Sequence, residues 1–362
     1  MSRSYYGRPV IKETIWGSPE IPGYLFLGGL AGASSMLAGF AQASGHQELA
    51  RASKTAATGA IALSAVALVK DLGRPSRFLN MLRVVKVTSP MSVGTWLITG
   101  YGPLAGAAAA SALTGKLPKA GAAATVGAAA LGAGVSTYTA ALICDTAVPA
   151  WHDGHREMPY LFAGSAATAA GGLGMLAVAP RDAGPAVRFA VLGALTELTA
   201  KSLLLKRLGE GAKPYQQGRA GKLLEVGEVL TAAGLAGAVL ASRDRTTAAL
   251  SGLALLASSA LTRFGIFEAG RASARDPAET IEPQRRRLLQ KSKPVIQNAR
   301  VLLSAPHSCQ CQECQPGGHL TEGPRFHDAL QQGWELRLAS CAAVGRIACL
   351  RHSDGQLRPG DA

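Results

Sequence analysis

The sequence contains a series of apolar stretches, each close to 20 residues long and separated from the next by a polar loop. Because an α-helix rises 1.5 Å per residue, about 20 residues span the ~30 Å hydrocarbon core of a bilayer. A soluble domain has no need of repeated stretches this long. We therefore expect an all-α integral membrane protein with about eight transmembrane helices, arranged as two four-helix bundles. The expected helices cover residues 21–43, 54–69, 92–113, 120–143, 160–179, 186–205, 223–241 and 247–267.

Polar segments flank this apolar region on both sides. We expect residues 1–21 to form an interfacial N-terminal segment, residues 22–268 the transmembrane domain, and residues 269–362 a disordered tail, since the tail is polar, basic and aperiodic. Within the first apolar stretch, Gly28 and Gly32 belong to a face of small residues, which predicts close packing against a neighbouring helix.

The positive charge of the chain lies mainly in loops and in the tail. The formal net charge is +14, but no basic face carries interleaved aromatic residues, so we expect no binding of nucleic acid. Eight crossings place both termini on one side of the bilayer, together with the loops after the second, fourth and sixth helices. That side carries more Lys and Arg than the other, which predicts cytoplasmic termini and a location in the inner (plasma) membrane of the cell.

The tail contains a Cys-x-Cys-x-x-Cys sequence with a histidine on either side. Thiolates and imidazoles are zinc ligands, but this spacing is not a standard four-ligand arrangement. We therefore expect no metal site in the chain. The residues concerned are Cys309, Cys311, Cys314, His307 and His319.

Several sequence blocks carry a family resemblance. They are DLGRPSRF at 71–78, YLFLGGLAGAS at 24–34, TSPMSVGTW at 88–96, TYTAALICDTAVPAWH at 137–152 and RFGIFEAG at 263–270. Together they resemble the membrane subunits of the NrfD/polysulfide-reductase (PsrC-like) family, over roughly residues 5–280. The tail beyond them does not look like this family.

The resemblance implies a quinone-binding or menaquinone-binding membrane subunit of a multi-subunit oxidoreductase. Such a subunit passes electrons between the quinone pool and a four-cluster ferredoxin-like iron–sulfur subunit, and a molybdopterin oxidoreductase subunit commonly completes the complex. Whether the chain is itself an enzyme stays open. The resemblance also implies that the chain binds no haem. The histidines before the tail agree with this expectation, since His46, His152 and His155 all lie outside the centres of the expected helices, where an axial haem ligand would be.

The resemblance further implies where quinone binds. A family tyrosine that donates a hydrogen bond to quinone is best matched by Tyr138. Trp16 and Glu20 precede the first helix on the side where the family's pocket opens. The alternative for Tyr138 and Trp16 is an ordinary aromatic residue at the membrane interface. The alternative for Glu20 is charge pairing at a helix N-terminus.

Three charged residues around the second expected helix are candidates for partner docking. Asp71 and Arg74, with Arg77, begin the loop that we expect to face the iron–sulfur subunit. A structural ion pair with no redox role explains the same residues equally well.

Ionisable residues inside apolar stretches are costly and usually face a bundle interior or a cavity. Glu197 and Lys201 are four residues apart and share a helix face, and so do Glu225 and Glu228, three residues apart. Together with Asp145 on the terminal side, they form a candidate proton path. The alternative is a set of neutralised or interfacial ion pairs.

Two other function classes remain open. A small-solute or ion transporter would share the glycine-rich helices and buried charges, although no inverted repeat relates the two halves. A purely structural membrane anchor would need no quinone site.

Overall fold

The computed structural model describes residues 11, 16–71, 80–240, 244–281 and 285. Within these residues the secondary structure is helical and contains no strand. Backbone contacts divide the chain into two units, Met1–Leu288 and Leu289–Ala362. The second unit lies wholly outside the described residues, and so do the predictions made for the cysteines of the tail.

The described part of the chain holds eight helices of 20 residues or more. In chain order these are α1 (Glu20–Ala43), α2 (Gln47–Asp71), α4 (Pro90–Thr114), α5 (Pro118–Cys144), α7 (Met158–Ala177), α8 (Gly184–Leu208), α10 (Gly218–Leu240) and α11 (Arg245–Arg275). The short helices α6 (Pro149–Asp153), η1 (Pro180–Asp182), η2 (Gly209–Ala212) and α9 (Lys213–Gln216) lie in the connections.

Each expected apolar stretch corresponds to one long helix, and the helices that exceed the prediction most are α2 and α11. Helix α2 begins at Gln47 rather than at residue 54, and α11 continues to Arg275 rather than ending at residue 267. Both extensions contain charged residues, such as Glu48 and Arg51 in α2. Hydropathy detects only the part of a helix that matches the bilayer core, so it misses turns that continue beyond that core.

Five of the described helices are long and apolar enough to cross a membrane, namely α1, α2, α5, α7 and α11. Helix α8 carries Glu197 and Lys201 in its interior, and α10 carries Glu225 and Glu228. These charges lower the hydropathy of the two helices, although their lengths match those of the others. The chain is therefore a multi-pass helical membrane protein, and crossing by all eight long helices is a further expectation.

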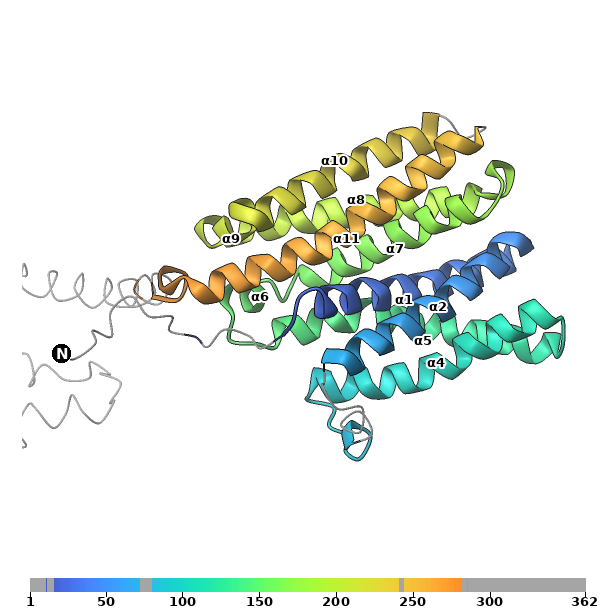
Figure 1. Ribbon diagram of the computed structural model, residues 1–362, viewed down its shortest axis with the longest axis horizontal. Helices are drawn as coiled ribbons and strands as arrows, with labels where there is room; N and C mark the ends of the chain where they lie inside the picture. The colour runs from blue at the N-terminus through green and yellow to red at the C-terminus, as the bar shows by residue number, and fades with distance from the viewer. Residues whose placement is uncertain (1–10, 12–15, 72–79, 241–243, 282–284, 286–362) are drawn as a thin grey trace, which may run out of the picture. The chain divides into compact units, whose positions relative to one another are not determined.

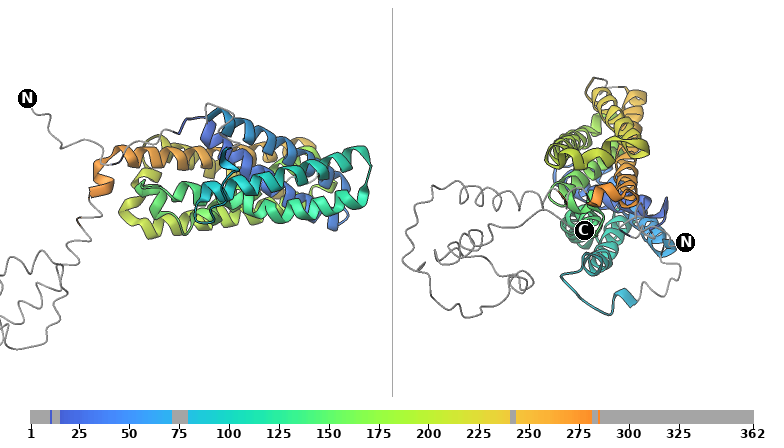
Figure 2. Two further views of the ribbon diagram at one scale, coloured as in Figure 1. Left: turned by 90° about the horizontal axis from the view of Figure 1, so that it is seen from below. Right: turned by 90° about the vertical axis from the view of Figure 1, so that its left-hand side faces the viewer.

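The long helices lie side by side and alternate in direction (Figure 1), as the two further views also show (Figure 2). Helix α1 occupies a central position, because it contacts α2, α5, α7 and α11. Further contacts join α4 to α5, α7 to α8, α7 to α11, and α10 to α11. Alternation brings the start of α1, the end of α2, the end of α5 and the short helices α6 and α9 to one end, which we call the Glu20 end.

The polarity of the helix faces is that of a protein solvated by lipid. Many large aliphatic side chains point outward, with Val66 65% exposed and Leu192 64% exposed. Several hydroxyl side chains point inward, and Ser165, Thr168 and Ser258 are all completely buried. A protein in water gains free energy by the opposite arrangement, since it buries apolar rather than polar surface.

Glycines allow the helix backbones to approach one another closely. A β-carbon on Gly172 of α7 would lie 2.7 Å from the carbonyl oxygen of Gly252 in α11, closer than real contacts allow. Gly32 of α1 and Gly132 of α5 meet in the same way. The small-residue face predicted for the first helix is thus confirmed at Gly32, and it places α1 directly against α5.

Candidate functional site

Two tyrosines meet inside the bundle toward the Glu20 end. Tyr138 of α5 is 9% exposed, Tyr24 of α1 is 3% exposed, and their hydroxyl groups are hydrogen-bonded to each other. Two hydroxyls carry two protons, but the bond between them uses only one as a donor. The second O–H can therefore be donated to a further acceptor, such as a carbonyl oxygen of a bound molecule.

Four helices surround the tyrosine pair. Gly94 of α4 lies directly against the ring of Tyr138, leaving no room there for a β-carbon. Ser64 of α2 is completely buried and donates a hydrogen bond of 3.2 Å to the backbone oxygen of Tyr24. Apolar surroundings with one available phenolic donor suit a quinone, whose ring and tail are apolar and whose two oxygens accept hydrogen bonds.

Charged groups lie one helical turn nearer the Glu20 end than Tyr24. The Oε1 atom of Glu20 is 3.0 Å from the Nζ atom of Lys70 at the end of α2. The neighbouring Asp71 accepts a hydrogen bond of 3.3 Å from the backbone N–H of Gly17. The structure therefore brings together Glu20, predicted to bind quinone, and Asp71, predicted to dock a partner.

Trp16 lies in an aromatic stack. Its ring centroid is 5.8 Å from that of Trp151 in α6, which in turn lies 5.7 Å from the ring of Phe267 in α11. Trp151 is fully buried and donates a hydrogen bond of 2.9 Å from Nε1 to the carbonyl oxygen of Ile266. Trp16 thus packs against α6 shortly before α1 begins.

Of the other residues predicted for docking, Arg74 and Arg77 lie outside the described residues. Asp145 follows the end of α5 with an exposed side chain. Glu225 is exposed on α10. The structure thus places both carboxylates at the surface of the helices.

The remaining members of the candidate path have partners on other helices. Glu197 and Lys201 share a face of α8 as predicted, but Lys201 pairs with Glu228 of α10 at 2.6 Å between Nζ and Oε1. Glu197 instead accepts a hydrogen bond of 2.7 Å from the hydroxyl of Thr262 in α11. The buried Arg263, next to Thr262, was not singled out from the sequence, because a cation near the end of an apolar stretch is typical of the interface.

An ion pair stabilises the connection between α6 and α7. Arg207, in the last turn of α8, donates to both carboxylate oxygens of Glu157, at 2.6 and 2.5 Å. The hydrogen bonds from Arg207 hold the pKa of Glu157 below its usual value. His152 and His155, in the same connection, are exposed, and the hydrogen bonds of their rings are to backbone oxygens.

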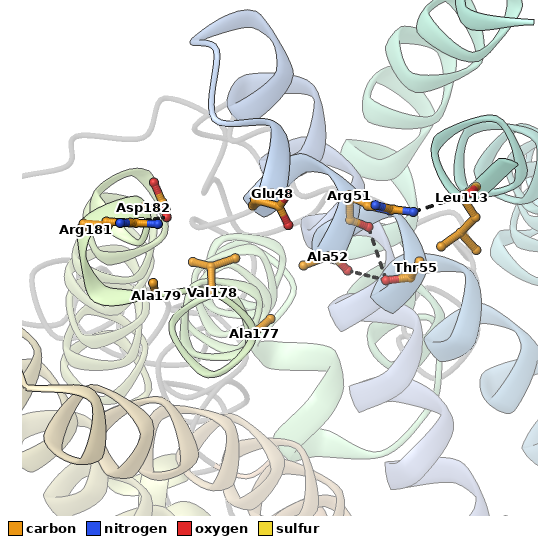
Figure 3. A pocket seen from close by; sticks show the side chains of 10 residues that line it. All are labelled: Glu48, Arg51, Ala52, Thr55, Leu113, Ala177, Val178, Ala179, Arg181 and Asp182. Carbon is orange, nitrogen blue, oxygen red and sulfur yellow. Dashed lines mark hydrogen bonds and ion pairs between the residues drawn. The ribbon is translucent and has the colours of Figure 1, made fainter. Parts of the chain in front are cut away.

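A groove lies at the opposite end of the helices. Two arginines and two acids line it together with small apolar residues (Figure 3). The lining residues are Glu48, Arg51, Ala52, Thr55, Leu113, Ala177, Val178, Ala179, Arg181 and Asp182. Its charges balance, and Arg181 is paired with the adjacent Asp182 at 3.3 Å. The groove shares no residue with the tyrosine pair.

Within the described residues, no group of three or more His, Cys, Asp or Glu side chains is placed to hold a metal ion. No curated protein matches the chain. The family model described as polysulphide reductase, NrfD, matches residues 10–200, a range shorter than the resemblance at 5–280 but more than half of the chain. The matched range includes both tyrosines of the buried pair, together with Glu20 and Asp71. Because the match covers more than half of the chain, the chain belongs to the NrfD family of membrane subunits of quinone-linked oxidoreductase complexes.

Proposed function

We propose that this chain is the quinone-binding membrane subunit of a multi-subunit oxidoreductase. It exchanges electrons between quinone in the bilayer and a four-cluster ferredoxin-like iron–sulfur subunit, which a molybdopterin oxidoreductase subunit joins. In this proposal all eight long helices cross the inner membrane as two four-helix bundles, and the Glu20 end faces the cytoplasm. The observation that carries the proposal is the buried hydroxyl pair of Tyr24 and Tyr138.

The tyrosine pair has the chemistry that quinone recognition needs. The available O–H donates to a quinone carbonyl oxygen, while the hydrogen bond between the hydroxyls fixes the direction of the Tyr138 side chain. Oxidation of a quinol releases two electrons and two protons. The electrons leave through the cluster of the partner subunit, and the protons leave through groups such as the carboxylates of Glu20 and Asp71, one turn nearer the solution.

The charged groups at the Glu20 end support docking of the partner at this face. Glu20, Lys70 and Asp71 join the start of α1 to the end of α2, so they fix the surface around the opening of the proposed pocket. A cluster held above this surface would lie over the tyrosine pair, which shortens the distance for electron transfer.

Tyr138→Phe tests the proposal, because it removes one hydroxyl and keeps the ring. A net hydrogen bond contributes about 0.5–1.5 kcal/mol, and a buried group left without a partner costs about 1–3 kcal/mol. We therefore expect turnover of a quinone analogue by the assembled complex to fall by roughly 10-fold, since 1.4 kcal/mol is a factor of ten. Tyr24→Phe should have a similar effect, because it removes the partner of Tyr138.

The matched control is Tyr160→Phe on α7, since Tyr160 is 66% exposed. It should leave turnover unchanged, and all three variants should retain the iron–sulfur subunit on purification. Asp71→Asn should instead reduce retention of that subunit more than quinone affinity. Unchanged quinone kinetics in both tyrosine-pair variants would refute this site and favour a structural anchor. Solute uptake by the chain alone would favour a transporter.

A further inference from the structure

A carboxylate lies buried in the second half of the chain, away from the tyrosine pair. This residue is Glu197 in α8, which is only 4% exposed. Its Oε1 atom accepts the hydrogen bond from Thr262, but its Oε2 atom is buried without a hydrogen-bond partner. An unsatisfied buried carboxylate oxygen is costly, so it points to a ligand or to a proton.

The guanidinium group next to Glu197 also has nitrogen atoms without a hydrogen-bond partner. Arg263 of α11 is 1% exposed, and its Nη2 atom donates a hydrogen bond of 2.6 Å to the backbone oxygen of Phe162. The guanidinium also lies 3.7 Å from the centre of the Phe162 ring. Its Nε and Nη1 atoms have no hydrogen-bond partner. The two opposite charges are therefore neighbours without a direct salt bridge.

A narrow cavity connects Glu197 to a second ion pair. Glu197, Lys201 and Thr262 line it, together with Tyr215 and apolar residues. On its border, the Nζ atom of Lys201 is paired with Glu228, whose side chain is 47% exposed. Titratable groups thus run from the outer face of α10 to the buried carboxylate of α8.

We propose that Glu197 is a proton-exchange site, reached from the surface of α10 through Glu228 and Lys201. The ammonium group of Lys201 passes one proton across the cavity to the Glu197 carboxylate, which becomes a neutral carboxylic acid. The carboxylate of Glu228 takes up a proton from solution and becomes a carboxylic acid. Glu228 then gives this proton to the neutral amine of Lys201, which restores the ammonium group and the Glu228 carboxylate. The whole sequence moves one proton inward and leaves Lys201 and Glu228 as they were.

Groups from three helices face Glu197 and make proton transfer to and from its carboxylate reversible. Lys201 is the cation on its own helix and Arg263 is the cation from α11, while α7 contributes the neutral hydroxyl of Ser165. Arg263 stabilises the carboxylate form from one side, and Lys201 supplies the proton from the other. This site needs no quinone, so it can be tested separately from the tyrosine pair.

The test is acid-minus-base infrared difference spectroscopy on the purified full chain in lipid nanodiscs without quinone. The unsubstituted protein should show a C=O band of a buried carboxylic acid that shifts in D₂O. Glu197→Gln should remove this band, because an amide cannot take up the proton. Glu225→Gln is the matched control, since Glu225 is an exposed glutamate of α10, and it should leave the band intact.

Two further variants keep the proposal testable if Glu197→Gln does not fold. Thr262→Val removes the hydrogen bond to Oε1 and should shift the frequency of the band. Glu228→Gln should leave the band in place but slow its hydrogen–deuterium exchange on the order of 10²-fold, the scale of a positioned acid or base. An unchanged frequency in Thr262→Val together with an unchanged exchange rate in Glu228→Gln would overturn the proposal, as would a band that persists in Glu197→Gln.

Discussion

Gly94→Ala should disable the tyrosine pair without touching either tyrosine. Gly94 lies against the Tyr138 ring, where a β-carbon would come far closer to two ring carbons than real contacts allow. The ring cannot rotate freely, because its hydroxyl is bonded to Tyr24. Overpacking of a core costs about 1–3 kcal/mol, and the loss of the hydroxyl bond adds about 0.5–1.5 kcal/mol.

We expect turnover of a quinone analogue by the Gly94→Ala complex to fall roughly 10-fold, as each 1.4 kcal/mol is a factor of ten. The midpoint of thermal unfolding should fall by roughly 2–4 °C per kcal/mol. Gly106→Ala is the matched control on the same helix, because nothing lies within 4 Å of its added β-carbon. It should raise the midpoint slightly, since alanine favours a helix over glycine by about 1 kcal/mol. Equal turnover and equal midpoints for the two variants would refute the packing argument.

Two further predictions concern the ion pair of Glu157 and the orientation of the chain. Because Arg207 lowers the pKa of Glu157, their pair stabilises the fold at pH values above the ordinary carboxyl pKa, and this stability is lost as the pH falls through the lowered pKa. Glu157→Gln should therefore lower the free energy of unfolding at neutral pH by about 0.2–1 kcal/mol, and the unfolding midpoint with it. The difference between the two proteins should vanish in acid. A difference that stays constant with pH would contradict this prediction. Reporter fusions after Lys119 and after Arg275 should report opposite sides of the membrane, with Arg275 inside, and an outside signal after Arg275 would reverse the proposed orientation.

The sequence predicted every long helix of the described residues, because each contains a mainly apolar stretch bounded by polar loops. It did not predict the full lengths of α2 and α11, whose ends are charged. It also predicted that Glu197 and Lys201 share a face, which follows from the helical repeat alone. Their actual partners could not be predicted, because Thr262 and Glu228 approach them from other helices.

The same limit applies to the candidate quinone site. The resemblance pointed to Tyr138, but its partner Tyr24 is 114 residues away in the chain. Nothing in a single sequence distinguishes Tyr24 from an aromatic residue at the membrane interface. The pairing depends on how closely α1 and α5 approach, and that approach depends on the glycine contact between Gly32 and Gly132. Covariation of these two positions among homologous sequences is the signal that would reveal such a contact.

Helix α1 separates the tyrosine pair from the buried charges of the second half. Tyr24 faces α5, whereas a β-carbon on Gly29 would lie 3.1 Å from the Nη2 atom of Arg263 in α11. The two residues are five positions apart, which is about 7.5 Å along the axis and about 140° around it. The proposed quinone site and the proposed proton-exchange site therefore use different faces of one helix. Because no described side chain belongs to both sites, Tyr138→Phe and Glu197→Gln test them independently. Coupling between the sites can pass through α1 or through the direct contact between α5 and α7.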